Sequence, residues 1–292
     1  MRCRMEEGAF VNEESDTVMR FMEKCTPGGC FFCAWEDFYA RKGFGSRLRQ
    51  IQEHKENVGE SMDRYSIIEE KKKREIVLLR GRGCIYRKCP FCDYHSDSSP
   101  NDEENFAINQ EVLSKVTGQY QNLEVINSGS VFELDERTLE FIRSVCRDRN
   151  IRTIHFESHY LYRDKIPALR EQFGEFDLKM KLGLETFDYD FREGVLCKGI
   201  AQKDPAVISQ QFQEANFLFG IAGQSLESMR RDIELGLQYF ERICVNMMCE
   251  NTTKIHPDKQ VIEEFIRELY PQYKDNERVD ILLNNTDFGV GD

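Results

Sequence analysis

The sequence predicts an α/β protein: a partial or near-complete (βα)6-type parallel barrel, preceded by a small N-terminal, Cys-containing helical segment. Three observations carry this prediction. From residue 74 onward, short apolar stretches alternate with longer amphipathic ones, the pattern of βα units and a parallel sheet. The chain has 292 residues, a length at which an α/β barrel can form one domain. Polar or glycine-rich motifs follow the predicted strands, as expected at the carboxyl rim of a barrel.

The elements follow in order along the chain. Residues 1–73 are polar and rich in Glu, Lys and Arg, so we assign 1–73 to the N-terminal segment and 74–292 to the barrel with a C-terminal extension. The apolar stretches predict strands at 75–80, 123–127, 151–157, 178–184, 216–222 and 242–248. The amphipathic stretches predict helices at 103–117, 135–147, 163–173, 204–214, 225–240 and 258–270. A last short strand is expected at 279–283.

The charge balance limits the classes of partner. The chain carries 52 acidic and 40 basic side chains, a net charge of −12. Nucleic-acid-binding proteins usually present a basic face, because phosphate neutralisation supplies most of the affinity. The balance favours a small-molecule substrate, and no nucleic acid is expected. No apolar run approaches the length of a membrane span, and the N-terminus lacks the apolar core of a signal peptide, so we expect a cytoplasmic protein and no membrane.

The cysteines are the most informative residues. Six of the eleven fall in two groups with the same C-x4-C-x2-C spacing. Cys84, Cys89 and Cys92 directly follow the first predicted strand of the barrel. Three thiolates can hold three corners of a 4Fe–4S cluster and leave one iron open to another ligand. Zinc is the alternative, but a structural zinc site needs a fourth ligand, and only His95 lies nearby. We therefore favour the cluster.

The second group is Cys25, Cys30 and Cys33, and no predicted strand precedes it. It could hold zinc or a second iron–sulfur cluster, with Cys3 as a fourth ligand. Packed thiols beside two phenylalanines are an equally good interpretation. The spacing alone leaves these possibilities open.

Further motifs follow the later strands. Ser128, Gly129 and Ser130 form a small polar turn after the second predicted strand. Glu185 ends the fourth strand in a Gly-Leu-Glu-Thr stretch, and the fifth is followed by Gly220-Ile-Ala-Gly223-Gln-Ser. Because the carboxyl ends of parallel strands meet at one rim, we expect these motifs and the Cys84 group to lie together.

Through these motifs, residues 74–255 resemble the radical S-adenosylmethionine (SAM) superfamily. The resemblance implies that Cys84, Cys89 and Cys92 ligate a 4Fe–4S cluster whose open iron binds SAM. The common spacing in the superfamily is C-x3-C-x2-C, so this chain has one extra residue, which a flexible loop can absorb. The resemblance further implies cleavage of SAM to a 5′-deoxyadenosyl radical that abstracts hydrogen from a substrate, and a reductant protein such as flavodoxin or ferredoxin.

The resemblance also implies roles for individual residues that bind SAM. Phe91, the aromatic residue before the last cysteine, matches the position that packs near the adenine. The Ser128–Ser130 turn matches the one that receives the amino group of SAM. Glu185 matches the polar position near the ribose, and Gly220 and Gly223 match the motif that lets backbone approach the adenine.

The substrate side is predicted from a third pattern. His155, Glu157 and His159 alternate along a predicted strand, so all three share one face, which looks into the lumen at a barrel rim. Two imidazoles and a carboxylate could bind substrate hydroxyls, transfer protons or hold zinc, and we predict these three as catalytic residues. Asn284, Asn285 and Asp287 follow the last strand, and their side chains could contact a purine-like base.

The resulting hypothesis is a radical SAM enzyme acting on a small molecule. The compact size of the chain, its variant spacing and its strand pattern make it similar to a lyase that returns a modified deazaguanine base to its aminomethyl precursor in a salvage reaction. Two alternatives remain: a radical SAM enzyme that modifies tRNA or a peptide, and a non-enzymatic zinc-binding module.

Overall fold

The computed structural model describes residues 3–6, 9–12, 18–19 and 64–283. The chain divides into two compact units, Met1–Ser61 and Met62–Asp292. In the first unit, β1 (Cys3–Glu6), β2 (Ala9–Asn12) and β3 (Val18–Met19) form an antiparallel sheet in sequence order. The described residues of this predicted helical segment are therefore strands. Cys25, Cys30 and Cys33 lie outside the described residues.

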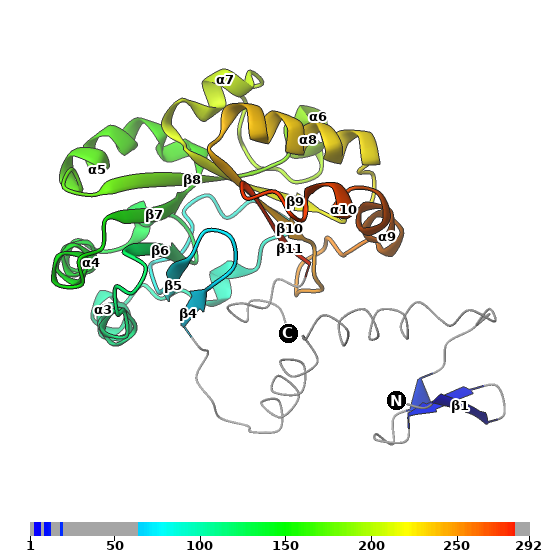
Figure 1. Cartoon of the computed structure of the whole chain (residues 1–292), viewed down its shortest axis with the longest axis horizontal. Helices are drawn as coiled ribbons and strands as arrows, with labels where there is room; N and C mark the ends of the chain where they lie inside the picture. The colour runs from blue at the N-terminus through cyan, green and yellow to red at the C-terminus, as the bar shows by residue number, and fades with distance from the viewer. Residues whose placement is uncertain (1–2, 7–8, 13–17, 20–63, 284–292) are drawn as a thin grey trace. The chain divides into compact units, whose positions relative to one another are not determined.

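The second unit is built on an eight-stranded sheet, curled into an open half-barrel with its helices on the outer face (Figure 1). Its order is β11-β10-β9-β8-β7-β6-β5-β4. All neighbours pair in parallel except β4, which pairs antiparallel with β5. The strands are β4 (Tyr65–Ile68), β5 (Arg74–Leu79), β6 (Asn122–Asn127), β7 (Thr153–Ser158), β8 (Asp177–Glu185), β9 (Glu214–Phe219), β10 (Arg242–Met247) and β11 (Val279–Leu282).

The helices begin at polar caps that satisfy their first backbone N–H groups. Asn101, Asp135, Ser225 and Asp258 cap the four longest helices in this way. The α-helices are α3 (Asp102–Ser114), α4 (Glu136–Asp148), α5 (Ile166–Gln172), α6 (Tyr189–Gly194), α7 (Pro205–Ile208), α8 (Leu226–Tyr239), α9 (Lys259–Glu268) and α10 (Tyr270–Tyr273). Short 3-10 helices are η1 (Tyr94–Ser96), η2 (Val131–Glu133), η3 (Tyr160–Lys165) and η4 (Ser209–Gln211).

The two faces of the sheet differ in chemistry because side chains alternate along each strand. Phe156, Met180 and Phe217 belong to the main apolar core and are fully buried. Their neighbours in sequence, such as His155, Lys181 and Asn216, point to the opposite, concave face. The concave face is therefore polar, which is unusual for a buried surface and indicates a functional site.

The predicted elements agree with the structure to within a few residues, with four differences, the first of which is that helix α6 was not predicted. The helix predicted at 204–214 is wrong: α7 has four residues, η4 follows, and β9 begins at Glu214 because Ala215, Phe217 and Phe219 need the period of a strand to reach the core. The first three residues of the helix predicted at 163–173 belong to η3. Strand β4 was not predicted, and it extends the sheet to Tyr65, ahead of the boundary expected at residue 73.

At the amino-terminal side of the strands, two basic side chains at and before the start of β5 reach β11, the far edge of the sheet. The Arg74 guanidinium at the start of β5 lies 3.3 Å from the Asp280 carboxylate of β11. Lys71, in the loop before β5, donates a hydrogen bond to the Val279 carbonyl. The residues in these two contacts are 206 and 208 positions apart in sequence. The contacts form a seam between the start of β5 and β11 and draw the half-barrel together at this end.

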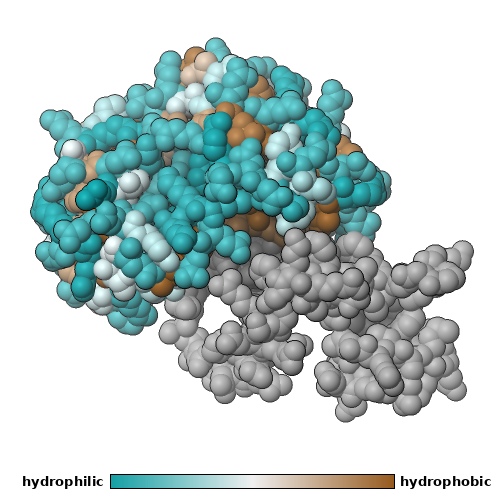
Figure 2. Space-filling model, viewed as in Figure 1, coloured by the Kyte–Doolittle hydropathy of each residue, from teal (hydrophilic) through white to brown (hydrophobic). Residues whose placement is uncertain are grey.

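The outer surface is ordinary for a charged protein. The face seen in Figure 2 is mostly hydrophilic, with hydrophobic residues in small groups. None of the helices in the described part of the chain combines the length and apolar character needed to span a membrane.

Candidate active site

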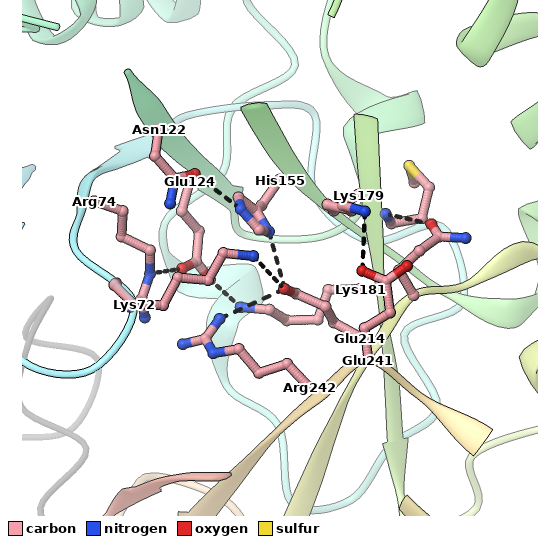
Figure 3. A network of polar contacts seen from close by, with 12 residues as sticks. Lys72, Arg74, Asn122, Glu124, His155, Lys179, Lys181, Glu214, Glu241 and Arg242 are labelled. Atoms are coloured by element: carbon pink, nitrogen blue, oxygen red, sulfur yellow. Dashed lines mark hydrogen bonds and ion pairs between the residues drawn. The ribbon is translucent and has the colours of Figure 1, made fainter. Parts of the chain in front are cut away.

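An ionic network lines the concave face near the amino-terminal ends of the strands (Figure 3). Glu124 bonds to both Arg74 and Lys181, and its side chain is only 3% exposed. Burial alone would raise the pKa of Glu124, but the Lys181 ammonium and the Arg74 guanidinium outweigh it and hold that pKa well below its usual value. Further charged members are Lys72, Glu214, Arg242 and Asp280.

His155 belongs to this network. Its Nδ1 lies 3.0 Å from Glu214 Oε2, its Nε2 lies 2.9 Å from Asn122 Oδ1, and the residue is fully buried. Both ring nitrogens are occupied by protein, so the structure does not support His155 as a catalytic residue that meets substrate. The alternation gave the correct face, but His155 lies too deep, among the ions below the lumen.

Glu157 lies two residues further along β7, toward the carboxyl rim. Its side chain is 27% exposed, well above the members of the network. Asn216 donates to Glu157 Oε1 at 2.9 Å, and the Lys181 ammonium lies 3.7 Å from the same oxygen. Burial raises the pKa of Glu157, and Lys181 opposes that rise.

The three cysteines sit on the loop that follows β5. Cys84, Cys89 and Cys92 are free thiols, each partly exposed. Burial raises the pKa of Cys89 to about 12; Lys198 opposes this, and Cys92 and Cys84 add to it. The three thiols are thus close enough to influence one another's charge. Such a set becomes stable as thiolates only when positive charge is bound, as a metal cluster would provide.

Glu133 joins the cysteine loop to the Ser128–Ser130 turn. Its Oε1 accepts the Ile85 backbone N–H at 2.6 Å, and its Oε2 accepts the Ser130 N–H at 2.6 Å. A Cβ at Gly129 would lie 2.1 Å from Glu133 Oε2 and 2.9 Å from the Cys84 nitrogen. Only glycine permits this approach, so the turn lies directly against the first cysteine, as the sequence predicts.

The hydroxyls of the same turn are already engaged. Ser128 Oγ donates to Asp97 at 3.0 Å, and Ser130 Oγ donates to Ser158 Oγ at 3.1 Å. These hydrogen bonds fix the turn in place.

Lys198 and Glu185 form a buried ion pair beside the cysteines. Lys198 Nζ lies 2.7 Å from Glu185 Oε1 and 5.6 Å from the centroid of the Phe91 ring. Burial would lower the pKa of Lys198, but Glu185 and Cys89 outweigh it and raise that pKa. Glu185 has φ +71° and lies at a register shift between β8 and β9, and such irregularities re-aim side chains at functional sites.

His159 reaches the rim but has a structural environment. Its Nδ1 accepts the Leu161 N–H at 3.1 Å, and its Nε2 lies 2.9 Å from the Lys198 carbonyl. Burial and the Lys198 charge lower the pKa of His159 to about 4. A neutral ring with both nitrogens bonded is not available for proton transfer near neutral pH, so the structure does not support the predicted catalytic role of His159 either.

A small apolar cluster lies at the other side of the rim. Its buried members, Leu196, Leu218, Ile221 and Met248, pack against Phe91. Asn251 donates to the Phe91 carbonyl at 2.8 Å and ties the cysteine loop to the end of β10.

The two glycines that follow β9, Gly220 and Gly223, are each required by the local structure. Gly220 has φ +89°, and a Cβ there would lie 2.7 Å from Ile262 of α9, so helix packing requires glycine. Gly223 has φ +95°, which requires glycine for its backbone. Neither reason depends on a ligand.

Some predicted sites cannot be placed. Cys25, Cys30, Cys33, Asn284, Asn285 and Asp287 lie outside the described residues. Within residues that are described, no group of three His, Cys, Asp or Glu side chains is close enough to hold a single metal ion.

Sequence reasoning missed Lys198, Glu133, Asn216 and Lys181. The Ser130-Val-Phe-Glu133 stretch is a capping-box pattern and could have indicated Glu133. Lys198 lies in an irregular loop with no motif, so no sequence signal marks it.

Comparison with known proteins gives one strong match. Neither the family models nor the curated proteins matched. Among solved structures, queuine lyase from Clostridium spiroforme, bound to SAM and queuine, is 46% identical, with a TM-score of 0.76 over 80% of this chain and 100% of that one. Two structures of Streptococcus suis SuiB, one bound to S-adenosylmethionine, are 15% identical over 70% of this chain and 49% and 48% of theirs, with TM-scores of 0.46 and 0.44. The identity and complete coverage of the first match show that the chain belongs to the queuine lyase family of radical SAM enzymes.

Proposed function

We propose that this protein is a queuine lyase. It would convert the modified base queuine to its aminomethyl-deazaguanine precursor by breaking the bond to the cyclopentenediol. The single observation that supports this most is the 46% identity to a queuine lyase over that protein's whole length. The rim motifs add a second line of support, since the cysteine loop, the Ser128–Ser130 turn and Glu185 gather at the carboxyl ends of β5, β6 and β8.

The residues of the rim fit a 4Fe–4S cluster held by Cys84, Cys89 and Cys92. Their thiols lie on one loop, influence one another's charge and have a buried ammonium, Lys198, beside them. When bound with SAM, such a cluster supplies the electron that generates the 5′-deoxyadenosyl radical. The chain itself positions this chemistry: Glu133 and Gly129 hold the turn against Cys84, and Phe91 and its apolar cluster would accept the adenine.

The substrate would lie inside the half-barrel, between the rim and the ionic network. Glu157 and Asn216 are partly exposed on this concave face, whereas Glu124 and Glu214 are 3% and 2% exposed and closed off by their ion partners. The network would act as a rigid floor, and the residues above it would contact the base.

Two further parts of the proposal concern the surroundings of the enzyme. The seven cysteines whose side chains are described are all free thiols, which suits a reducing compartment such as the cytoplasm. The reaction also requires a one-electron donor, for which a flavodoxin or ferredoxin is the natural class. The predicted zinc has no support among the described residues and is not part of this proposal.

The test is anaerobic turnover. Reconstituted protein is incubated with SAM, dithionite and queuine, and 5′-deoxyadenosine and the aminomethyl-deazaguanine are measured by mass spectrometry. Both products should appear, and the deazaguanine should be absent without SAM. Cleavage of SAM without any change to queuine would reject the substrate while keeping the enzyme class. Turnover of tRNA carrying the modified base, but not of the free base, would move the substrate to nucleic acid.

A further inference from the structure

The concave face holds one carboxylate whose setting differs from the rest. Among the described residues, the carboxylates of this face are those of Glu124, Glu157, Glu185, Glu214 and Asp280. Four of their side chains are between 2% and 12% exposed and engaged by a cation, whereas that of Glu157 is 27% exposed. Glu157 is therefore the acidic group of this face most accessible to a ligand.

Its depth places it between the cofactor rim and the ionic floor. Glu157 lies two residues beyond His155 and two before His159 on the same chain segment. At about 3.3 Å per residue, it stands roughly 6–7 Å above the buried imidazole and the same distance below the rim. A substrate that reacts with a radical formed at the rim must occupy this level of the barrel.

The described contacts hold the carboxylate by one oxygen. Asn216 Nδ2 donates to Oε1 at 2.9 Å, and Lys181 Nζ lies 3.7 Å from that same atom. Among the described residues, none forms a hydrogen bond or ion pair with Oε2. Lys181 is itself fixed by Glu124, so the carboxylate is oriented from below while its second oxygen remains free to accept hydrogen bonds.

The walls beside Glu157 suit a flat ring. Ile126 of β6 is partly exposed and packs against buried Leu78, which gives an apolar surface at this level. Across the register, Gly183 of β8 pairs with Asn216 and has no side chain. A Cβ at Gly183 would lie 3.1 Å from Lys198 Nζ. The space beside Gly183 is therefore narrow, which suits a flat ring.

We propose that Glu157 binds the N1–H and 2-amino edge of the deazaguanine ring, with Asn216 and Lys181 positioning its carboxylate; this rests on the proposed queuine lyase function. The edge presents two adjacent N–H donors, and a carboxylate is an acceptor-only group that matches them. Glu157 is thus a specificity-determining residue. The C7 substituent is attached to the five-membered ring, on the side of the base away from the N1–H and 2-amino edge. This orientation therefore directs the cyclopentenediol away from Glu157 and toward the rim.

The experiment measures affinity separately from chemistry. Queuine binding to reconstituted protein with SAM, but without reductant, is followed by calorimetry. Glu157→Gln should weaken queuine binding about 10- to 100-fold, because the amide replaces one acceptor with a donor that faces N–H groups. In turnover assays the KM for queuine should rise by a similar factor. Glu175→Gln, which removes an exposed carboxylate paired with Arg147, is the matched control and should bind as wild type.

A second ligand gives the sharper readout. A queuine analogue without the 2-amino group should bind wild type at least 10-fold more weakly than queuine. It should bind Glu157→Gln almost as well as queuine binds that variant. Unchanged affinity of Glu157→Gln for queuine, or undiminished discrimination against the analogue, would overturn the inference. If wild type neither binds nor converts queuine, the proposed function itself fails; if wild type converts queuine and the variant keeps its KM, only the role of Glu157 fails.

Discussion

Lys198 Nζ lies 2.7 Å from Glu185 Oε1, in a buried ion pair that joins the loop after α6 to the end of β8. Both side chains are 10% exposed. Gly183 leaves the space for the pair, since a Cβ there would lie 3.1 Å from the ammonium. The pair therefore supplies a fixed positive charge beside Cys89 and Cys92, and it fixes the carboxylate that the superfamily resemblance predicts near the ribose.

Removing one partner of this pair should cost more than removing both. Lys198→Met leaves a buried carboxylate without its cation and should lower the free energy of unfolding by about 3–5 kcal/mol. Lys198→Met combined with Glu185→Gln should recover at least half of that loss. Urea unfolding of the two variants and wild type checks this. Equal losses in the single and the double variant would show that the pair does not act as a unit.

Glu133 should be necessary for SAM binding although it need not touch SAM. Its carboxylate accepts hydrogen bonds from Ile85, Ser130 and Tyr162, and an amide would turn an N–H₂ group toward these donors. Glu133→Gln should cost about 1–3 kcal/mol of stability and weaken SAM binding. Glu136→Gln, an exposed neighbour on α4, is the control. A variant with the melting temperature and SAM affinity of wild type would contradict this role.

Iron content should depend on the first rim loop and not on buried thiols elsewhere. Cys89→Ala should lower the iron bound per chain after anaerobic reconstitution and abolish 5′-deoxyadenosine formation. Cys146→Ala removes a fully buried thiol of α4 in the apolar core and should keep both, at a modest cost in stability. Iron analysis and visible absorption measure the difference. Full cluster absorption in Cys89→Ala would refute its assignment as a ligand.

Stability should decrease as the pH rises through neutrality because of Asp232. This buried residue of α8 accepts the Phe187 N–H at 2.7 Å, and burial raises its pKa to about 7 from 3.8, although the hydrogen bonds from Thr186 and Phe187 oppose the shift. The folded state therefore binds a proton more tightly than the unfolded chain. The contribution of protonated Asp232 to the free energy of unfolding is complete below pH 4. It is lost as the pH rises through 7, and the total loss is at most about 4 kcal/mol.

Asp232→Asn keeps the acceptor for Phe187 and removes the titration. The variant should be as stable as wild type near pH 4 to 5 and more stable at pH 8. Glu234→Gln, exposed on the same helix, should follow the wild-type pH profile. Thermal melts from pH 5 to pH 8 test this, and parallel profiles for wild type and Asp232→Asn would exclude Asp232 as the source.

The sequence predicted the strands well because each carries apolar residues with a period of two that reach one core. Strand β4 was not predicted because its four residues are all half-buried, so its two faces do not differ in burial. The same alternation placed His155 and Glu157 on the concave face. It could not tell that one is buried among ions and the other is open, because depth depends on the register with β8 and β9, which no local pattern contains.

The rim was predictable where backbone geometry demands a particular residue. Gly129 is such a case, since its neighbours leave no room for a Cβ. Lys198 was not predictable, because it comes from an irregular loop after α6 and reaches the cysteines only through the fold. His159 was assigned to catalysis from its alternation with His155 and Glu157, a pattern that could not reveal its two hydrogen bonds to the backbone of Leu161 and Lys198.

The seam between Arg74 and Asp280 has a consequence for the order in which ligands pass. With the amino-terminal end of the barrel drawn together and filled by ions, a base held at the level of Glu157 has the carboxyl rim as its route in and out. SAM bound at that same rim would stand over it. We therefore expect the base to enter before the rim is covered, and the deazaguanine product to leave last. In such an enzyme, bound SAM would control access to the substrate site.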